Sequence, residues 1–152
     1  MIFYKKALLK DISSMQDLVK IEVEKGIILP RNKDEVATNI RSYTLCFEDD
    51  TLAGYGALHI HSDFLAEVRS LVVSKDYRNR GVGSEIVKKL LAEAKFYGVK
   101  NVMTLTYRDK FFINLGFKII DKSEIPMQKI WADCIKCKHF PICDEIALIY
   151  QI

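Results

Sequence analysis

Apolar positions along the chain follow two periods, one typical of strands and one typical of helices. Strand-like runs predict strands at residues 2–9, 43–47, 52–60, 66–73, 101–106, 117–120 and 146–152. Helical spacing predicts helices from residue 12 to near residue 26, and at residues 33–41, 83–97 and 109–115. Strands and helices mix without an internal repeat or a linker, which predicts one α+β domain over residues 1–152.

The run at 66–73 combines charged and apolar side chains. Strand alternation predicts two faces, one with Glu67, Arg69, Leu71 and Val73 and the other with Val68, Ser70 and Val72. Gly54 and Gly56 lie inside the preceding strand, which indicates a bulge or a close backbone approach.

Composition excludes several classes of protein. The chain has 152 residues, of which 49% are hydrophobic and 28% charged, as in ordinary globular domains. Its net charge of +3 is too small to indicate a nucleic-acid partner. The N-terminus has no signal-peptide pattern, and no apolar run approaches the ~20 residues of a membrane span. We therefore expect a cytoplasmic protein with neither nucleic acid nor membrane as a partner.

The segment 78–84 joins the strand at 66–73 to the following helix and reads Arg-Asn-Arg-Gly-Val-Gly-Ser. A helix that begins directly after a turn presents free backbone N–H groups and a positive dipole end. Lys75, Arg78 and Arg80 add positive charge there. The pattern predicts a site for a phosphate or pyrophosphate. The alternative is a tight turn that merely requires two glycines.

Two common phosphate-binding motifs do not fit this segment. A P-loop requires Lys after its second glycine, but Ser84 follows Gly83. A dinucleotide fingerprint requires a third glycine where the chain has Ile86. The remaining pattern is Arg-x-x-Gly-x-Gly between a strand and a helix.

This pattern, after the apolar residues 71–73, resembles the acetyl-coenzyme A signature of the GNAT N-acetyltransferase superfamily. Residues 111–117, Phe-Phe-Ile-Asn-Leu-Gly-Phe, resemble the last conserved block of that family. The resemblance implies a mixed central sheet of about seven strands, splayed between the fourth and fifth and flanked by about four helices. It also implies acetyl-CoA as a cofactor, and a homodimer is common in the family.

Residues 28–31, 66–71 and 129–147 are similar to short, stand-alone bacterial amino-acid N-acetyltransferases of the N-acetylglutamate synthase type. This resemblance implies acetyl transfer to the α-amine of a small amino acid, with L-glutamate in arginine biosynthesis as the first candidate. The alternatives are another amine acceptor, such as a polyamine, an antibiotic or a protein N-terminus. A non-catalytic acetyl-CoA sensor or metal-binding module is a further alternative.

The resemblance also implies which residues bind the cofactor. The pantetheine arm would pair with the backbone at Leu71 and Val73, and the pyrophosphate would lie on the N–H groups of the turn. The implied set is Leu71, Val72, Val73, Arg78, Asn79, Arg80, Gly81, Val82, Gly83, Ser84 and Phe112.

Glu67 is the candidate base for deprotonating the amine, with an ion pair to Arg69 as the alternative interpretation. Many family members have Tyr as the leaving-group acid where this chain has Phe112, which cannot donate a proton. Tyr107 is the candidate substitute, with ordinary packing as its alternative, or the thiolate leaves without an acid. Arg31 and Arg69 are the candidate carboxylate-binding residues, because Arg binds carboxylates through two donors.

Cys134, Cys137 and Cys143 lie within ten residues, with His139 between them. Cys-x-x-Cys is half of a common zinc site, and a second pair farther along is missing. Zinc binding, a disulfide between Cys134 and Cys137, and packed thiols all stay open.

Overall fold

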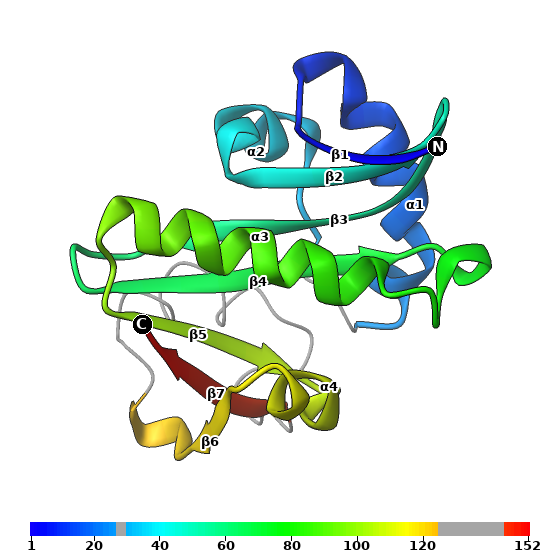
Figure 1. The fold of residues 1–152 in the computed structure, drawn as a ribbon. Coiled ribbons are helices and arrows are strands. Elements are labelled where there is room, and N and C mark those ends of the chain that lie inside the picture. The colour runs from blue at the N-terminus through cyan, green and yellow to red at the C-terminus, as the bar shows by residue number, and fades with distance from the viewer. Residues whose placement is uncertain (27–29, 125–144) are drawn as a thin grey trace.

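The computed structural model describes residues 1–26, 30–124 and 145–152. Its centre is a seven-stranded sheet in the order β1-β2-β3-β4-β5-β7-β6 (Figure 1). Among the strands of the described residues, β4 and β5 alone pair in parallel, and the other neighbours are antiparallel. The strands are β1 (Ile2–Lys6), β2 (Tyr43–Glu48), β3 (Thr51–Ile60), β4 (Leu65–Val73), β5 (Asn101–Thr106), β6 (Lys118–Ile120) and β7 (Ile146–Gln151). The predicted mixed α+β architecture is confirmed.

Four α-helices accompany the sheet in the described part of the chain: α1 (Ile12–Glu24), α2 (Lys33–Thr38), α3 (Val82–Tyr97) and α4 (Asp109–Asn114). The helix α3 lies along one face of the sheet, where Ile86 and Leu90 pack against Val68 (Figure 1). The helices α1 and α2 contribute Met15 and Val36 to a second core around Tyr55. The sheet therefore lies between the two cores.

The helix α2 is shorter than the predicted 33–41. It ends at Thr38, and a 3₁₀ turn follows at Ile40–Ser42. The side-chain amide of Asn39 donates to the carbonyl of Glu35, which satisfies an acceptor at the helix end. The other predicted helices and strands agree with the structure to within a few residues.

The strands β4 and β5 separate after three paired residues. The last pair is Glu67 with Met103, although β4 continues to Val73 and β5 to Thr106. Just beyond it, the hydroxyl of Thr104 donates to the carbonyl of Val68 at 2.9 Å. The predicted splay between the fourth and fifth strands is therefore present.

A β-bulge reverses the faces of β4. Arg69 pairs with Ala57 and Val72 with Tyr55, so two residues of β4 lie opposite the single Gly56. Ser70 has a φ of 57°, the left-handed conformation common in bulges. A Cβ on Gly56 would lie 3.2 Å from Leu71 Cδ1, so the glycine leaves room for that side chain. The bulge suggested by the glycines is confirmed.

The predicted faces of β4 are wrong beyond this bulge. Before it, Val68 packs in the core beneath α3, and Glu67 points to the opposite face. After it, Leu71 and Val73 pack against the core beneath α3, whereas Val72 belongs to the core beneath α1 and α2. Leu71 and Val73 therefore do not share a face with Glu67, because the extra residue shifts the alternation.

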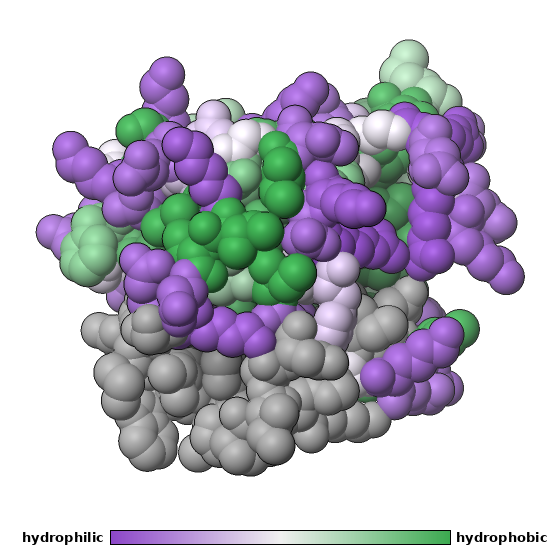
Figure 2. Space-filling view, turned by 90° about the horizontal axis from the view of Figure 1, so that it is seen from below, coloured by the Kyte–Doolittle hydropathy of each residue, from purple (hydrophilic) through white to green (hydrophobic). Residues whose placement is uncertain are grey.

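Among the coloured residues of the face seen from below, hydrophilic side chains predominate and hydrophobic ones gather near the middle of the view (Figure 2). Ile113 of α4 and Ile119 of β6 are among the exposed large hydrophobic residues. In the described ranges, no helix has the length and apolar character needed to cross a membrane.

Candidate active site

The turn before α3 has the backbone geometry of an anion-binding site. Asn79 and Gly81 adopt left-handed φ values of 63° and 79°. The first helical hydrogen bond runs from Glu85 N to Gly81 O at 3.0 Å. The preceding N–H groups, including those of Val82 and Gly83, therefore have no intrahelical acceptor. A Cβ on Gly81 would meet no atom within 4 Å, so the space beside this residue is open.

The two arginines of this turn have different environments. Arg78 Nε donates to the carbonyl of Val73 at 3.2 Å, at the end of β4. Arg80 Nη2 lies 3.4 Å from Glu48 Oε2, and its guanidinium stacks 4.9 Å from the ring centre of Tyr77. The Tyr77 hydroxyl also donates to Glu48 (3.0 Å), which raises the pKa of Tyr77. Glu48 is the last residue of β2, one position beyond the strand predicted at 43–47.

Phe111, rather than Phe112, lies beside this turn. The ring of Phe112 is 3% exposed and packs 5.1 Å from the ring centre of Phe117 in the core. Phe111 Cζ lies 3.4 Å from the position of a Cβ on Gly83, in the first turn of α3. The family resemblance selected Phe112 for the cofactor site, and that assignment stays a prediction.

Glu67 lies at the point where β4 and β5 separate. Its side chain is 2% exposed, and its Oε1 lies 2.9 Å from Nε2 of His61, whose side chain is 4% exposed. His59 is the cross-strand partner of Glu67, and its Nδ1 lies 3.0 Å from Nη2 of Arg69. The sequence-based alternative for Glu67, an ion pair with Arg69, stays a prediction beside this contact with His61. Sequence reasoning missed both histidines, although their two-residue spacing puts them on one face.

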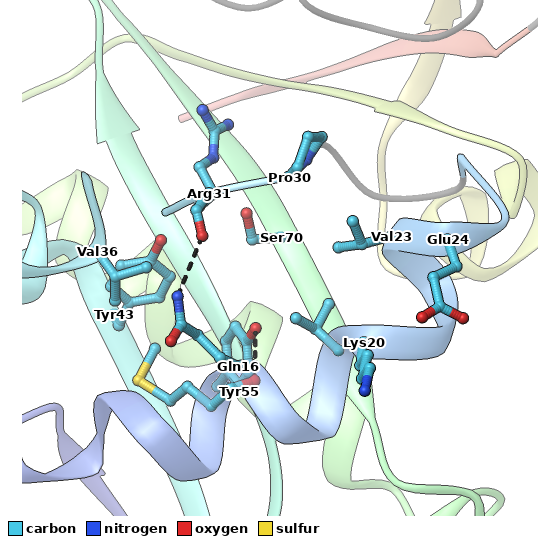
Figure 3. A pocket seen from close by; sticks show the side chains of 12 residues that line it. Gln16, Lys20, Val23, Glu24, Pro30, Arg31, Val36, Tyr43, Tyr55 and Ser70 are labelled. Atoms are coloured by element: carbon cyan, nitrogen blue, oxygen red, sulfur yellow. Dashed lines mark hydrogen bonds between the residues drawn. The ribbon is translucent and has the colours of Figure 1, made fainter. Parts of the chain in front are cut away.

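A cavity of about 270 Å³ lies beside the β4 bulge, between α1, the segment before α2 and the sheet (Figure 3). Arg31, a candidate acceptor-binding residue, is among its lining residues. Gln16 Nε2 donates to the Arg31 carbonyl at 3.3 Å, and Arg31 Nη1 lies 3.7 Å from Glu35 Oε2. Ser70, next to Arg69, also lines it. Most other lining residues are apolar or aromatic, among them Met15, Val19, Val23, Val36, Tyr43 and Tyr55.

The remaining candidates are Tyr107 and the residues of the cysteine segment. Tyr107 follows β5 and is 38% exposed. Cys134, Cys137, His139 and Cys143 lie outside the described residues. Within the described ranges, no group of three or more His, Cys, Asp or Glu side chains could hold a metal ion.

The sequence model of the acetyltransferase (GNAT) family matches residues 14–117. The chain belongs to this family. It is therefore an acetyl-CoA-dependent acetyltransferase, as the resemblance implied. This GNAT chain is 34% identical to an uncharacterized N-acetyltransferase from Chlorobaculum tepidum. The match covers 95% of this chain and 93% of the relative. An amino-acid acetyltransferase from Shewanella oneidensis is 29% identical over 82% of this chain, which spans only 28% of that relative.

Solved structures share the GNAT fold. The N-acetylglutamate synthase of Neisseria gonorrhoeae, complexed with coenzyme A and N-acetyl-glutamate, matches with a TM-score of 0.86 and 20% identity. The match covers 99% of this chain and 35% of that one. A Mycobacterium tuberculosis protein in complex with CoA matches with a TM-score of 0.84 and 21% identity, over 99% of both chains.

Proposed function

We propose that this enzyme acetylates the α-amine of a small amino acid, with L-glutamate as the first candidate and arginine biosynthesis in the cytoplasm as its context. The observation that carries the proposal is the cavity containing Arg31 beside the bulge of β4, on the same face as Glu67. Arginine is suited to a carboxylate of the acceptor. Relatives named amino-acid acetyltransferases support this acceptor class.

The donor would bind between the separated strands and at the turn before α3. The pantetheine arm would pair with the backbone at Leu71 and Val73, and the pyrophosphate would lie on the N–H groups from Asn79 to Ser84. Arg78 would add charge beside them. The strand separation, the left-handed residues and the open space at Gly81 all suit this arrangement.

The proposed reaction is direct acyl transfer. Glu67 would accept a proton from the ammonium group of the acceptor, directly or through water. The free amine would then form a bond to the thioester carbonyl carbon while the C–S bond breaks, and the electron pair of that bond would leave on the thiolate. The amine nitrogen loses its second proton to solvent, and the thiolate gains one from Tyr107 or solvent.

A second acceptor class is favoured by the lining of the cavity. Its residues are mainly apolar, with Lys20, Glu24 and Arg31 as the charged exceptions. An amino acid with an apolar side chain would bury more of its surface there than glutamate would. Arg31 would then bind only the α-carboxylate.

An acceptor screen tests the proposal. The full chain would be incubated with acetyl-CoA and each amino acid, a polyamine or an N-terminal peptide, while thiol release and the acetylated product are measured. We expect product with an amino acid, and a rise in KM for it of roughly tenfold in Arg31→Met. Lys33→Met is the matched control. CoA binding without product from any acceptor would favour the non-catalytic sensor instead.

A further inference from the structure

The contact between Glu67 and His61 joins two side chains that are both almost fully buried. A buried carboxylate strongly favours its neutral form unless a donor or a cation stabilises the charge. His61 Nε2, 2.9 Å from Oε1, can supply that donor whether the ring is neutral or protonated.

The backbone around His61 holds its ring in this place. His61 lies directly after β3, and its N–H donates to the carbonyl of Leu65 at 3.0 Å across a short turn. Glu67 lies on the returning strand, at the last residue pair with β5. Both partners are therefore attached to the rigid part of the sheet rather than to its separated end.

Titratable and charged groups also lie near Glu67 on the neighbouring strands. Across β3 lies His59, and across β5 lies the apolar Met103. Arg69, two residues along β4, approaches Nδ1 of His59 at 3.0 Å. Because arginine is always a donor, Nδ1 of His59 is the acceptor in this contact.

We propose that His61 is a positioning residue that keeps Glu67 ionised and correctly oriented, and so sets the pH above which the enzyme can deprotonate its acceptor. The proposal rests on the proposed role of Glu67 as the base. The proton of the ammonium group passes to the Glu67 carboxylate only while that carboxylate is unprotonated. Loss of the His61 hydrogen bond therefore raises the pH needed for turnover.

The kinetic test compares the pH profiles of kcat/KM in the wild type, His61→Leu and His61→Gln. In His61→Leu we expect the acid limb to move up by about one pH unit or more. His61→Gln places an amide donor near the position of Nε2, so its limb is expected to stay close to that of the wild type. Lys5→Met, which removes the partner of the Asp11 carboxylate (2.7 Å), is the matched control that should leave the limb in place. An unmoved limb in His61→Leu overturns the proposal.

A second measurement does not depend on the acceptor. Carbon-13 NMR would follow the titration of the Glu67 carboxyl in the wild type and in His61→Leu. We expect a higher Glu67 pKa in the variant; equal values overturn the proposal. If His61→Leu does not fold, the Glu67 titration is compared between the wild type and His61→Ala instead, with the same expected and contradicting results. If no acceptor gives turnover, the proposed function is wrong. The titration of Glu67 would still show whether His61 lowers the pKa of its carboxyl.

Discussion

The hydroxyl of Thr104 donates to the backbone carbonyl of Val68 at the point where β4 and β5 separate (2.9 Å). Thr104 is 2% exposed, so water does not readily replace it. A side chain here takes the place of the next backbone hydrogen bond between the strands. The gap proposed for the cofactor thus begins at a defined residue.

Replacement of Thr104 by valine keeps the shape of the side chain but removes the donor. The buried carbonyl of Val68 then loses this hydrogen bond, and we expect the free energy of unfolding to fall by about 1–3 kcal/mol. Urea denaturation measures the change. Thr51→Val, at an exposed position of β3, is the control and should change stability little. Equal stability of the two variants would contradict this role of Thr104.

The arginines of the turn are expected to contribute unequally to CoA binding. Arg80 lies against the carboxylate of Glu48, which partly neutralises it. Calorimetric titration should show a roughly tenfold higher Kd for CoA in Arg78→Ala and a smaller rise in Arg80→Ala. Lys75→Ala, in the exposed 3₁₀ turn, controls for the loss of one positive charge. A larger effect for Arg80 than for Arg78 would show that the contact with Glu48 does not persist in the complex.

Introducing a tyrosine at position 112 is not expected to supply an acid for the leaving thiolate. Phe112 is 3% exposed in the core, so Phe112→Tyr buries a hydroxyl, at a cost of about 1–3 kcal/mol if it finds no acceptor. We expect lower stability and no gain in kcat. Phe111→Tyr, beside the first turn of α3, is the paired variant and should be better tolerated. A higher kcat in Phe112→Tyr would show that this position reaches the thiolate.

Stability is expected to depend on pH through Asp11. Burial alone would raise the pKa of this carboxyl, but hydrogen bonds from Lys5 Nζ (2.7 Å) and Leu8 N (2.8 Å) outweigh it and hold the pKa below its ordinary value. A group with a lowered folded-state pKa stabilises the protein fully above its unfolded pKa, and this is lost as the pH falls through the folded value.

The difference in unfolding free energy between the wild type and Asp11→Asn should therefore be largest near neutral pH and shrink below about pH 4. Urea titrations at several pH values measure it. A difference that grows in acid would mean that the Asp11 pKa is not lowered.

The order of strands and helices was predictable because apolar periodicity reflects which face of each element is buried. The reversal of the two faces of β4 was not predictable, because Ser70 is not glycine and nothing in the sequence marks its positive φ. The paired glycines of β3 indicated an irregularity but not the strand that carries the extra residue.

Residues of the candidate site were predictable where a local pattern or the family resemblance pointed to them. The turn before α3 and Glu67 belong to this group. The partners of these residues were not predictable: Glu48 lies 32 residues from Arg80, and His61 reaches Glu67 across a turn. Such pairs depend on the register between strands, which no short sequence motif encodes.

The extra residue at Ser70 allows the two ends of one strand to diversify separately. Glu67 and Arg69, before it, lie on the face opposite α3, whereas Leu71 and Val73, after it, are constrained by the packing of α3. A change of acceptor could thus arise by mutation on the Glu67 face of β4 without disturbing the residues that pack against α3. Insertion or deletion of a single residue in this strand would exchange the two surfaces, so natural variation here is expected to proceed by substitution at constant length.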